Sequence, residues 1–299
     1  MPNAIAITMT TAMDIRSALR EAMARLSAAN VPSHALAAEL LLMHTLGRDR
    51  AWLYAHPEFE LESASAEKYF ELVARRASGV PTQYLTGKQE FWGLEFEVTP
   101  DVLIPRPETE HVVEAALDRI GPARKNDSLR IADVGTGSGC SAVALALEFP
   151  NAEIFATDIS RAALAVAQSN AARHGVTGRI HFTETNLLDA IADGKRSFDL
   201  IASNPPYIGL ADEPTLQREV RAHEPAIALF AGDDGLAVYA PLIRDAAAFL
   251  DPGGLLVLEL GYISLPGVRA LLDRPDNWSD IRVANDLAGI PRVVSAYRS

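Results

Sequence analysis

The stretch LRIADVGTGSG, residues 129–139, decides the fold of this chain. Its first six residues predict a buried strand, and its glycines predict a tight turn that leads into a helix over residues 141–148. A strand, a glycine loop and a helix in this order are typical of the first unit of an α/β domain, whose loop lies close to a ligand.

The rest of the chain continues this alternation. Strands are expected over 153–157, 180–183, 198–203, 255–260, 281–285 and 292–297, and helices over 161–174, 235–250 and 266–272. Strands that alternate with helices pair in parallel, whereas the last two strands are joined by a short link and should pair antiparallel. The sequence therefore predicts an α/β fold with a doubly wound, mostly parallel, seven-stranded sheet.

Two regions precede this α/β domain. Residues 12–80 are expected to form a bundle of four short helices, because apolar residues recur every three or four positions from Ile15 to Leu26. Ser33 is expected to cap the second helix. Residues 81–108 carry β-type residues and are expected to form a hairpin linker, which leaves 109–299 as the α/β domain.

The charge of the chain argues against a nucleic-acid partner. The chain has 299 residues, 48% of them hydrophobic, and a net charge of −12. Basic and acidic residues nearly balance over the first 80 residues, so the acidic excess lies in the remainder. Because proteins bind nucleic acid chiefly by neutralising phosphates, we expect no direct nucleic-acid partner.

Membrane and metal chemistry are not expected either. The first 13 residues lack the basic and apolar regions of a signal peptide, and no run of eighteen apolar residues follows. Cys140 is the single cysteine, and the seven histidines are scattered rather than paired at a metal-ligand spacing. We expect a cytoplasmic monomer without a metal.

The glycine loop and the acid that follows it predict a cofactor site. Asp158 ends the next expected strand, 23 residues after Gly135, where an acid receives the hydroxyls of a ribose. The loop has Gly-x-Gly-x-Gly spacing rather than the Gly-x-Gly-x-x-Gly of dinucleotide sites, which favours a nucleoside carrying an amino acid, namely S-adenosylmethionine. Asn186 follows the third strand and is expected to meet the adenine amino edge, although a plain turn residue is the alternative.

A second motif, Asn204-Pro205-Pro206-Tyr207, predicts the substrate. It follows a buried strand, at the sheet edge where open α/β folds bind ligands. The Asn204 oxygen and the Pro205 carbonyl are expected to accept the two N–H groups of a planar amino group and to orient its nitrogen for methyl transfer. Pro206 keeps this wall rigid and Tyr207 packs on the planar group; the alternative is an exposed turn.

Together these residues resemble the class I S-adenosylmethionine-dependent methyltransferases that modify planar amino groups. Further segments resemble one family among them, the release factor glutamine methyltransferases (HemK/PrmC). These segments are PTQYLTG at 81–87, FWGLEF at 91–96, VLIPRPETE at 102–110, EP at 224–225 and GDDGL at 232–236.

The resemblance implies a Rossmann-like methyltransferase domain and N5-methylation of the glutamine in the Gly-Gly-Gln motif of peptide chain release factors. S-adenosylmethionine would be converted to S-adenosylhomocysteine, and the N-terminal bundle would aid substrate recognition. Carried over residue by residue, it places the cofactor on Gly135, Thr136, Gly137, Ser138, Gly139, Asp158, Asn186 and Asn204. It places the glutamine amide on Asn204, Pro205, Pro206 and Tyr207, with Asn204, Pro205 and Tyr207 as the catalytic residues.

Two alternatives remain open at this point. The same tetrapeptide suits an amino-methyltransferase acting on adenine or guanine in nucleic acid, although such an enzyme usually has a basic face. The other alternative is a non-catalytic nucleotide-binding or assembly module; the intact glycine loop, Asp158 and Asn204 argue against it, because these residues would normally be the first to change once catalysis is lost. Arg106 and Glu259 are expected to be structural, because Pro107 suits a helix start and Gly261 suits the end of a strand.

Overall fold

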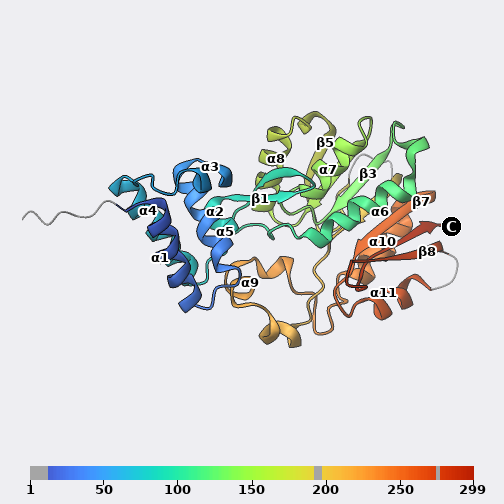
Figure 1. Ribbon diagram of the computed structural model, residues 1–299. Coiled ribbons are helices and arrows are strands. Elements are labelled where there is room, and N and C mark those ends of the chain that lie inside the picture. The colour runs from blue at the N-terminus through green and yellow to red at the C-terminus, as the bar shows by residue number, and fades with distance from the viewer. Residues whose placement is uncertain (1–12, 192–196, 274–276) are drawn as a thin grey trace, which may run out of the picture. The chain divides into compact units, whose positions relative to one another are not determined.

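The computed structural model describes residues 13–191, 197–273 and 277–299, and the chain divides into two compact units between Thr86 and Gly87 (Figure 1). The first unit is helical, as expected. Its helices are α1 (Ile15–Ala28), α2 (His34–Leu46), α3 (Arg50–Ala55), α4 (Ser63–Ala77) and the short α5 (Thr82–Thr86). Ile15, Leu26, Leu41 and Tyr69 are among the side chains buried in its core.

The caps of the first unit differ partly from expectation. Asp14 caps α1, since its carboxylate accepts a hydrogen bond of 2.8 Å from the backbone N–H of Ser17. Ser33 precedes α2, but its side chain makes no capping hydrogen bond, so the prediction that it caps this helix is wrong. The reason is its backbone: Ser33 has a φ of 49°, outside the extended conformation in which a side chain reaches the helix N-terminus.

A β-hairpin opens the second unit. Strands β1 (Lys88–Phe91) and β2 (Leu94–Glu97) pair antiparallel around Trp92 and Gly93. Phe91 and Phe96 are buried in the same core cluster as helix α7 (Cys140–Glu148), so the hairpin packs as part of the second unit. The sequence assigned residues 81–108 to a separate linker; that assignment remains a prediction.

The seven-stranded sheet has the order β5-β4-β3-β6-β7-β9-β8. Strands β3 to β7 run parallel, and β9 pairs antiparallel with both β7 and β8. The chain winds outward from β3 first through β4 and β5, then through β6 and β7, so β3 and β6 flank the point where the winding reverses. Ligands bind at this point in open α/β sheets. The strand bounds are β3 (Arg130–Val134), β4 (Glu153–Asp158), β5 (Ile180–Glu184), β6 (Phe198–Ser203), β7 (Leu250–Glu259), β8 (Trp278–Asn285) and β9 (Pro291–Arg298).

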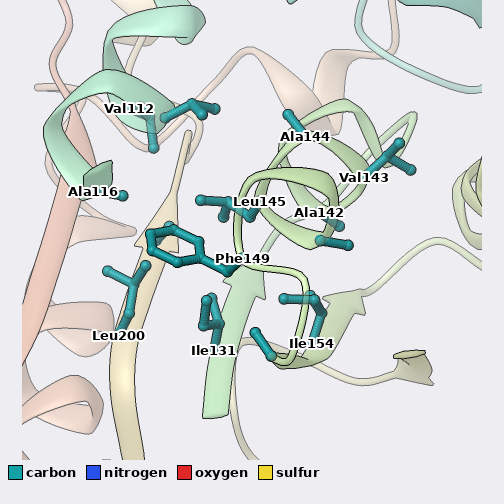
Figure 2. Packing of buried hydrophobic residues seen from close by; sticks show 14 of the residues in the cluster. Val112, Ala116, Ile131, Ala142, Val143, Ala144, Leu145, Phe149, Ile154 and Leu200 are labelled. Atoms are coloured by element: carbon teal, nitrogen blue, oxygen red, sulfur yellow. The ribbon is translucent and has the colours of Figure 1, made fainter. Parts of the chain in front are cut away.

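Helices cover both faces of the sheet and bury two apolar clusters. In Figure 2, the fully buried side chains of Leu145 and Phe149 lie among Ile131, Leu200 and Val112. This cluster packs helices α6 and α7 against strands β3 and β6. The second cluster packs α10 and α11 on the other side of the strands. The helices are α6 (Glu110–Ile120), α8 (Arg161–Arg173), α9 (Arg218–His223), α10 (Tyr239–Phe249) and α11 (Leu265–Leu272). Short 3₁₀ helices are η1 (Pro107–Thr109), η2 (Pro122–Arg124), η3 (Thr177–Arg179), η4 (Leu210–Thr215) and η5 (Ala226–Ala228).

Two element bounds near the site differ from expectation. Helix α10 begins at Tyr239 rather than at Gly235, and β7 begins at Leu250 rather than at Leu255. Leu250 pairs with Phe198, and a bulge between Phe198 and Leu200 accommodates the residues between them. The Pro-Gly-Gly sequence at 252–254 therefore lies inside an irregular strand, rather than in a loop after the helix.

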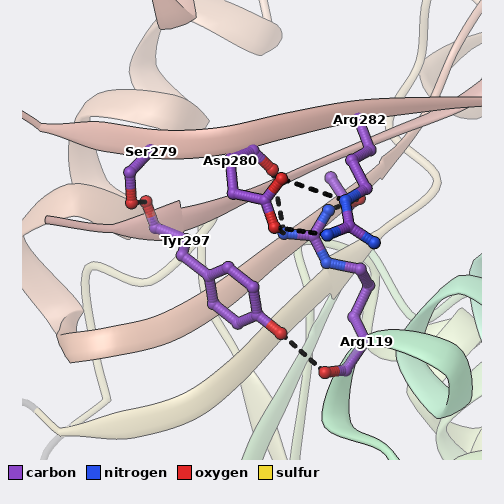
Figure 3. A network of polar contacts seen from close by, with 6 residues as sticks. Arg119, Ser279, Asp280, Arg282 and Tyr297 are labelled. Carbon is purple, nitrogen blue, oxygen red and sulfur yellow. Dashed lines mark hydrogen bonds and ion pairs between the residues drawn. The ribbon is translucent and has the colours of Figure 1, made fainter.

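The terminal hairpin is fastened to α6 by a network of polar contacts (Figure 3). Arg119 on α6 donates to the Asp280 carbonyl at 2.9 Å and to the Ser295 hydroxyl at 3.1 Å. The Tyr297 hydroxyl donates to the Arg119 carbonyl at 2.6 Å, and the Arg119 guanidinium lies 4.4 Å from the Tyr297 ring centre. These contacts join β8 and β9 to the helix. Within the ranges listed above, no helix is both long and apolar enough to cross a bilayer.

Candidate functional site

The glycine loop between β3 and α7 has the geometry of a ligand-binding turn. Gly135 and Gly137 have φ values of 74° and 55°, which side chains rarely tolerate, and a Cβ on either would meet no atom within 4 Å. Gly139 is constrained by packing, because its Cβ would lie 2.9 Å from the Cβ of Ala167 on α8. The loop therefore presents bare backbone on one side and packs against a helix at its end.

Asp158 lies beside this loop at the end of β4. One carboxylate oxygen accepts from the Gly137 N–H at 2.9 Å, and the other accepts from the Ser160 N–H at 2.8 Å. Each oxygen keeps a lone pair for a further donor. The side chain is thus held rigidly, as required of an acid that binds two vicinal hydroxyl groups.

Asp133, in strand β3, is a third member of this site, after the glycine loop and Asp158. Its side chain is buried, and desolvation raises the pKa of its carboxyl group to about 6. The Thr136 hydroxyl donates to it at 2.6 Å, and the Ala142 N–H opposes the rise in pKa. At neutral pH the carboxylate form predominates, which favours a cationic group nearby.

These residues line a cavity of about 210 Å³. The wall includes Gly135, Thr136, Gly137, Ser138, Asp133, Asp158, Asn186, Asn204 and Pro206. Gly139, Pro205 and Tyr207 do not line it. Asn186 donates to the Asp189 carboxylate at 3.3 Å, so its side chain is held as part of the wall.

A second cavity, of about 130 Å³, lies on the other side of Asn204. Tyr207, Arg106, Ile208, Val220 and Leu229 line it, and Leu103, Asn204 and Ala228 line both cavities. Asn204 therefore stands in the wall that the two cavities share. Pro205 is buried and lines neither cavity, so the role of its carbonyl remains a prediction.

The carboxamide of Asn204 has a defined orientation. Its Nδ2 donates to the Thr109 hydroxyl at 3.0 Å. Its Oδ1 accepts no hydrogen bond from the part of the chain that the structure describes. The arrangement leaves the Oδ1 acceptor and the second Nδ2 hydrogen for other groups.

Sequence comparisons decide which family this site belongs to. Residues 17–87 match the PrmC N-terminal domain, and residues 120–221 match the methyltransferase small domain. The release factor glutamine methyltransferase of Koribacter versatilis is 45% identical over 282 residues, which cover 94% of this chain and 98% of that protein. The protein of the same name from Moorella thermoacetica is 45% identical over 286 residues, which cover 96% of this chain and 99% of that protein. The chain belongs to the release factor glutamine methyltransferase family.

Solved structures support the fold of this methyltransferase. The hMettl16 catalytic domain, crystallised with an RNA hairpin, aligns over 76% of this chain and 82% of its own length, with a TM-score of 0.55 and 18% identity. A 16S rRNA methyltransferase of T. thermophilus, in complex with AdoMet and guanosine, matches 71% of this chain and 50% of its own, with a TM-score of 0.50 and 19% identity. The Rossmann-like methyltransferase fold expected from the sequence is confirmed.

Tyr207 in this methyltransferase is held by very close packing. A Cβ on Gly261 would lie 2.7 Å from its Cδ2, and a Cβ on Gly235 would lie 2.3 Å from its carbonyl oxygen. Its hydroxyl donates to Glu259 Oε1 at 3.4 Å. Gly261 was expected only to end a strand; in the structure its lack of a side chain also makes room for the Tyr207 ring.

Glu259 is the residue whose place the sequence did not reveal. Its side chain is 2% exposed, and burial raises the pKa of its carboxyl group to about 7. The neighbouring side chains of Thr109 and Tyr207 and the charge of Arg292 oppose this rise. The expectation of a purely structural strand end missed this polar centre, because its partners are distant in sequence.

Arg106 forms an ion pair with Glu224, whose side chain is 1% exposed. Glu224 also accepts from the Ile104 N–H at 3.3 Å. The pair therefore joins the segment before η1 to the segment after α9, along one side of the second cavity. This agrees with the expectation that Arg106 has a structural role, and it places that role at the wall of the second cavity.

Proposed function

We propose that this chain transfers a methyl group from S-adenosylmethionine to the side-chain amide nitrogen of the glutamine in the Gly-Gly-Gln motif of peptide chain release factors. The observation that carries the proposal is the position of Asn204. It lines both cavities and presents an acceptor oxygen, while one of its two N–H groups donates to Thr109. One cavity suits a methyl donor, and the other suits the group that receives the methyl.

The larger cavity fits S-adenosylmethionine by its chemistry. Asp158 is fixed as a double acceptor for the ribose hydroxyls, and the loop from Gly135 to Gly139 lies open to the amino-acid part. The anionic Asp133 favours the cationic ammonium and sulfonium groups. Asn186 is assigned to the adenine edge. S-adenosylhomocysteine would leave as the product.

The smaller cavity suits a glutamine side chain. An amide nitrogen is a weak nucleophile, so the site must hold it in line with the methyl–sulfur bond. Asn204 Oδ1 and the Pro205 carbonyl would each accept one N–H, while Pro206 and Tyr207 shape the wall. The nitrogen forms a bond to the methyl carbon, and the carbon–sulfur bond breaks with its electron pair going to sulfur. The nitrogen then loses one proton to solvent water.

The partner in this proposal is a whole release factor in the cytoplasm. We assign its recognition to the N-terminal helical unit and expect the protein to act as a monomer. The acidic composition supports a protein substrate rather than adenine or guanine in nucleic acid, the alternative that the tetrapeptide alone leaves open.

Incubation with methyl-labelled S-adenosylmethionine tests this function directly. Intact release factor and nucleic acid are offered separately, and the labelled product is digested and analysed by mass spectrometry. The expected result is one added methyl group on the Gly-Gly-Gln peptide of the release factor. Label in nucleic acid alone would refute the proposal.

A further inference from the structure

Three residues line both cavities and therefore form the boundary between them. They are Leu103, Asn204 and Ala228. If one cavity holds the methyl donor and the other holds the acceptor, the methyl group crosses at this boundary. In-line transfer depends on the distance and angle between donor and acceptor, so the placement of these three side chains bears directly on the rate.

Leu103 and Ala228 belong to segments that are distant in sequence, and the side chain of Glu224 joins these segments. One of its carboxylate oxygens accepts from the N–H of Ile104, the residue after Leu103, at 3.3 Å. The other oxygen forms the ion pair with the Arg106 guanidinium. Glu224 therefore sets the spacing between the two segments that carry Leu103 and Ala228.

The chain between Glu224 and Ala228 is short and stiff. Pro225 follows Glu224 directly, and its ring fixes its φ, which is −66°. The Ala228 N–H donates to the Pro225 carbonyl at 2.9 Å, within the turn η5. One residue further, the Leu229 carbonyl accepts from the Ile208 N–H at 2.9 Å, which attaches this turn to the end of the Asn-Pro-Pro-Tyr motif. A shift of Glu224 is therefore passed on to Ala228.

The burial of Glu224 makes its two partners obligatory. Its side chain is 1% exposed, whereas that of Arg106 is 31% exposed and lines the second cavity. A buried carboxylate is costly unless cationic and N–H groups surround it, and removing one partner leaves its charge uncompensated. The carboxylate is thus stable in this position only while both segments stay in place.

We propose that Glu224 is a positioning residue for methyl transfer: its bonds to Arg106 and Ile104 hold Leu103 and Ala228 at the boundary of the two cavities and so align the donor with the acceptor. This inference rests on the proposed function, because it assigns the methyl donor to one cavity and the glutamine amide to the other. Glu224 lines neither cavity, so it acts through the residues that do.

The experiment measures kcat and KM for an intact release factor in wild type, Glu224→Gln, Arg106→Gln and the double variant. Glu224→Gln keeps the size of the side chain and an acceptor for Ile104, but it removes the charge that holds Arg106. Its kcat should fall roughly ten- to a hundredfold, as for a displacement of about 1 Å near the chemistry. Its KM, and its affinity for S-adenosylhomocysteine by calorimetry, should stay within about threefold, because the loss is confined to the transition state.

The double variant and a conservative variant identify the pair as the cause. Because the two side chains act as one unit, the double variant should lose no more than the more impaired single variant. Arg106→Lys keeps a cation for Glu224 and should recover most of the kcat that Arg106→Gln loses. Losses that multiply in the double variant, or an Arg106→Lys variant as impaired as Arg106→Gln, would overturn the inference.

Asp280→Asn is the matched control for a general loss of stability. Asp280 forms an ion pair of 3.2 Å with Arg119, whose side chain is 5% exposed, and neither residue lines a cavity. This variant should keep the wild-type kcat even where it lowers the melting temperature. If it lowers kcat as much as Glu224→Gln does at an equal loss of melting temperature, the positioning role is refuted. If Glu224→Gln fails to fold, Arg106→Gln carries the same comparison, since its side chain is partly exposed.

A second measurement separates this inference from the proposed function. If wild type methylates no release factor, the proposed function fails, and hydrogen exchange of the free protein then tests the placement of the boundary alone. Amides of residues 226–231 should exchange faster in Glu224→Gln than in wild type, while those of β4 keep their rate. Unchanged exchange over 226–231 would show that Glu224 does not hold this segment, and the inference would be wrong.

Discussion

Replacing Gly261 by alanine would place a methyl group 2.7 Å from Cδ2 of the Tyr207 ring and 3.0 Å from its Cγ. Carbon atoms pack at about 3.5–4.0 Å, so the ring must move by roughly 1 Å. The Tyr207 hydrogen bond to Glu259, already 3.4 Å long, would then be lost. Overpacking of this kind costs about 1–3 kcal/mol of stability, and a 1 Å displacement near the chemistry costs up to about a hundredfold in rate.

The assay compares kcat for release factor methylation, the melting temperature and the affinity for S-adenosylhomocysteine. Gly261→Ala is expected to lower kcat and the melting temperature and to leave the affinity nearly unchanged. Gly178→Ala is the matched control, since its φ is ordinary and its Cβ would meet no atom within 4 Å. This control measures the stabilisation of about 0.4–1 kcal/mol that alanine gives by making the unfolded chain less flexible.

A double-mutant cycle identifies the cause. In a Tyr207→Ala background the ring is absent, so Gly261→Ala should cost much less there than in wild type. Equal losses of kcat in both backgrounds would refute the reasoning, because they would mean that the added methyl group acts through Ser264, which lies 2.7 Å from the same Cβ position, rather than through Tyr207.

Three further predictions follow from the same site. Asn204→Ala should abolish methyl transfer while calorimetry still detects S-adenosylhomocysteine, since the variant loses the acceptor for the substrate but keeps Asp158; a near-normal rate would contradict this. Cys140 should resist iodoacetamide at pH 8 until the protein is unfolded in urea. The reason is that burial raises the pKa of its thiol to about 12 and depletes the thiolate about a thousandfold. Rapid alkylation of the folded protein, detected by mass spectrometry, would contradict this. Removal of residues 12–80 should raise KM for an intact release factor, and an unchanged KM would refute a recognition role for the helical unit.

Much of the fold could be predicted because its signals are local. The strand ending at Val134, the glycine turn and the acid at 158 lie within one stretch of about thirty residues of a βαβ unit, where spacing alone places them together. The terminal hairpin was likewise indicated by its short link. These features depend on residues that are neighbours in sequence, and they are confirmed in type, with bounds that differ by a few residues.

The polar centre around Glu259 could not be found in this way. Tyr207 and Glu259 are 52 residues apart, and Asn204 and Thr109 are 95 apart, so their contacts exist only after the sheet has formed. Ser33 failed for a different reason, since a serine before a helix is a reliable cap only when its backbone is extended. The sequence therefore indicated residues that line the cavities, but not the residues that contact them from behind.

The position of β9 in the sheet has a consequence for the order of synthesis. This strand follows all the others along the chain, yet it lies between β7 and β8. Until the ribosome has made residues 291–298, β8 has no partner strand and the outer side of β7 is an open, aggregation-prone edge. The nascent domain therefore has an incomplete sheet until these residues are made. A nonsense mutation before Pro291 would remove an interior strand rather than shorten the sheet at its edge.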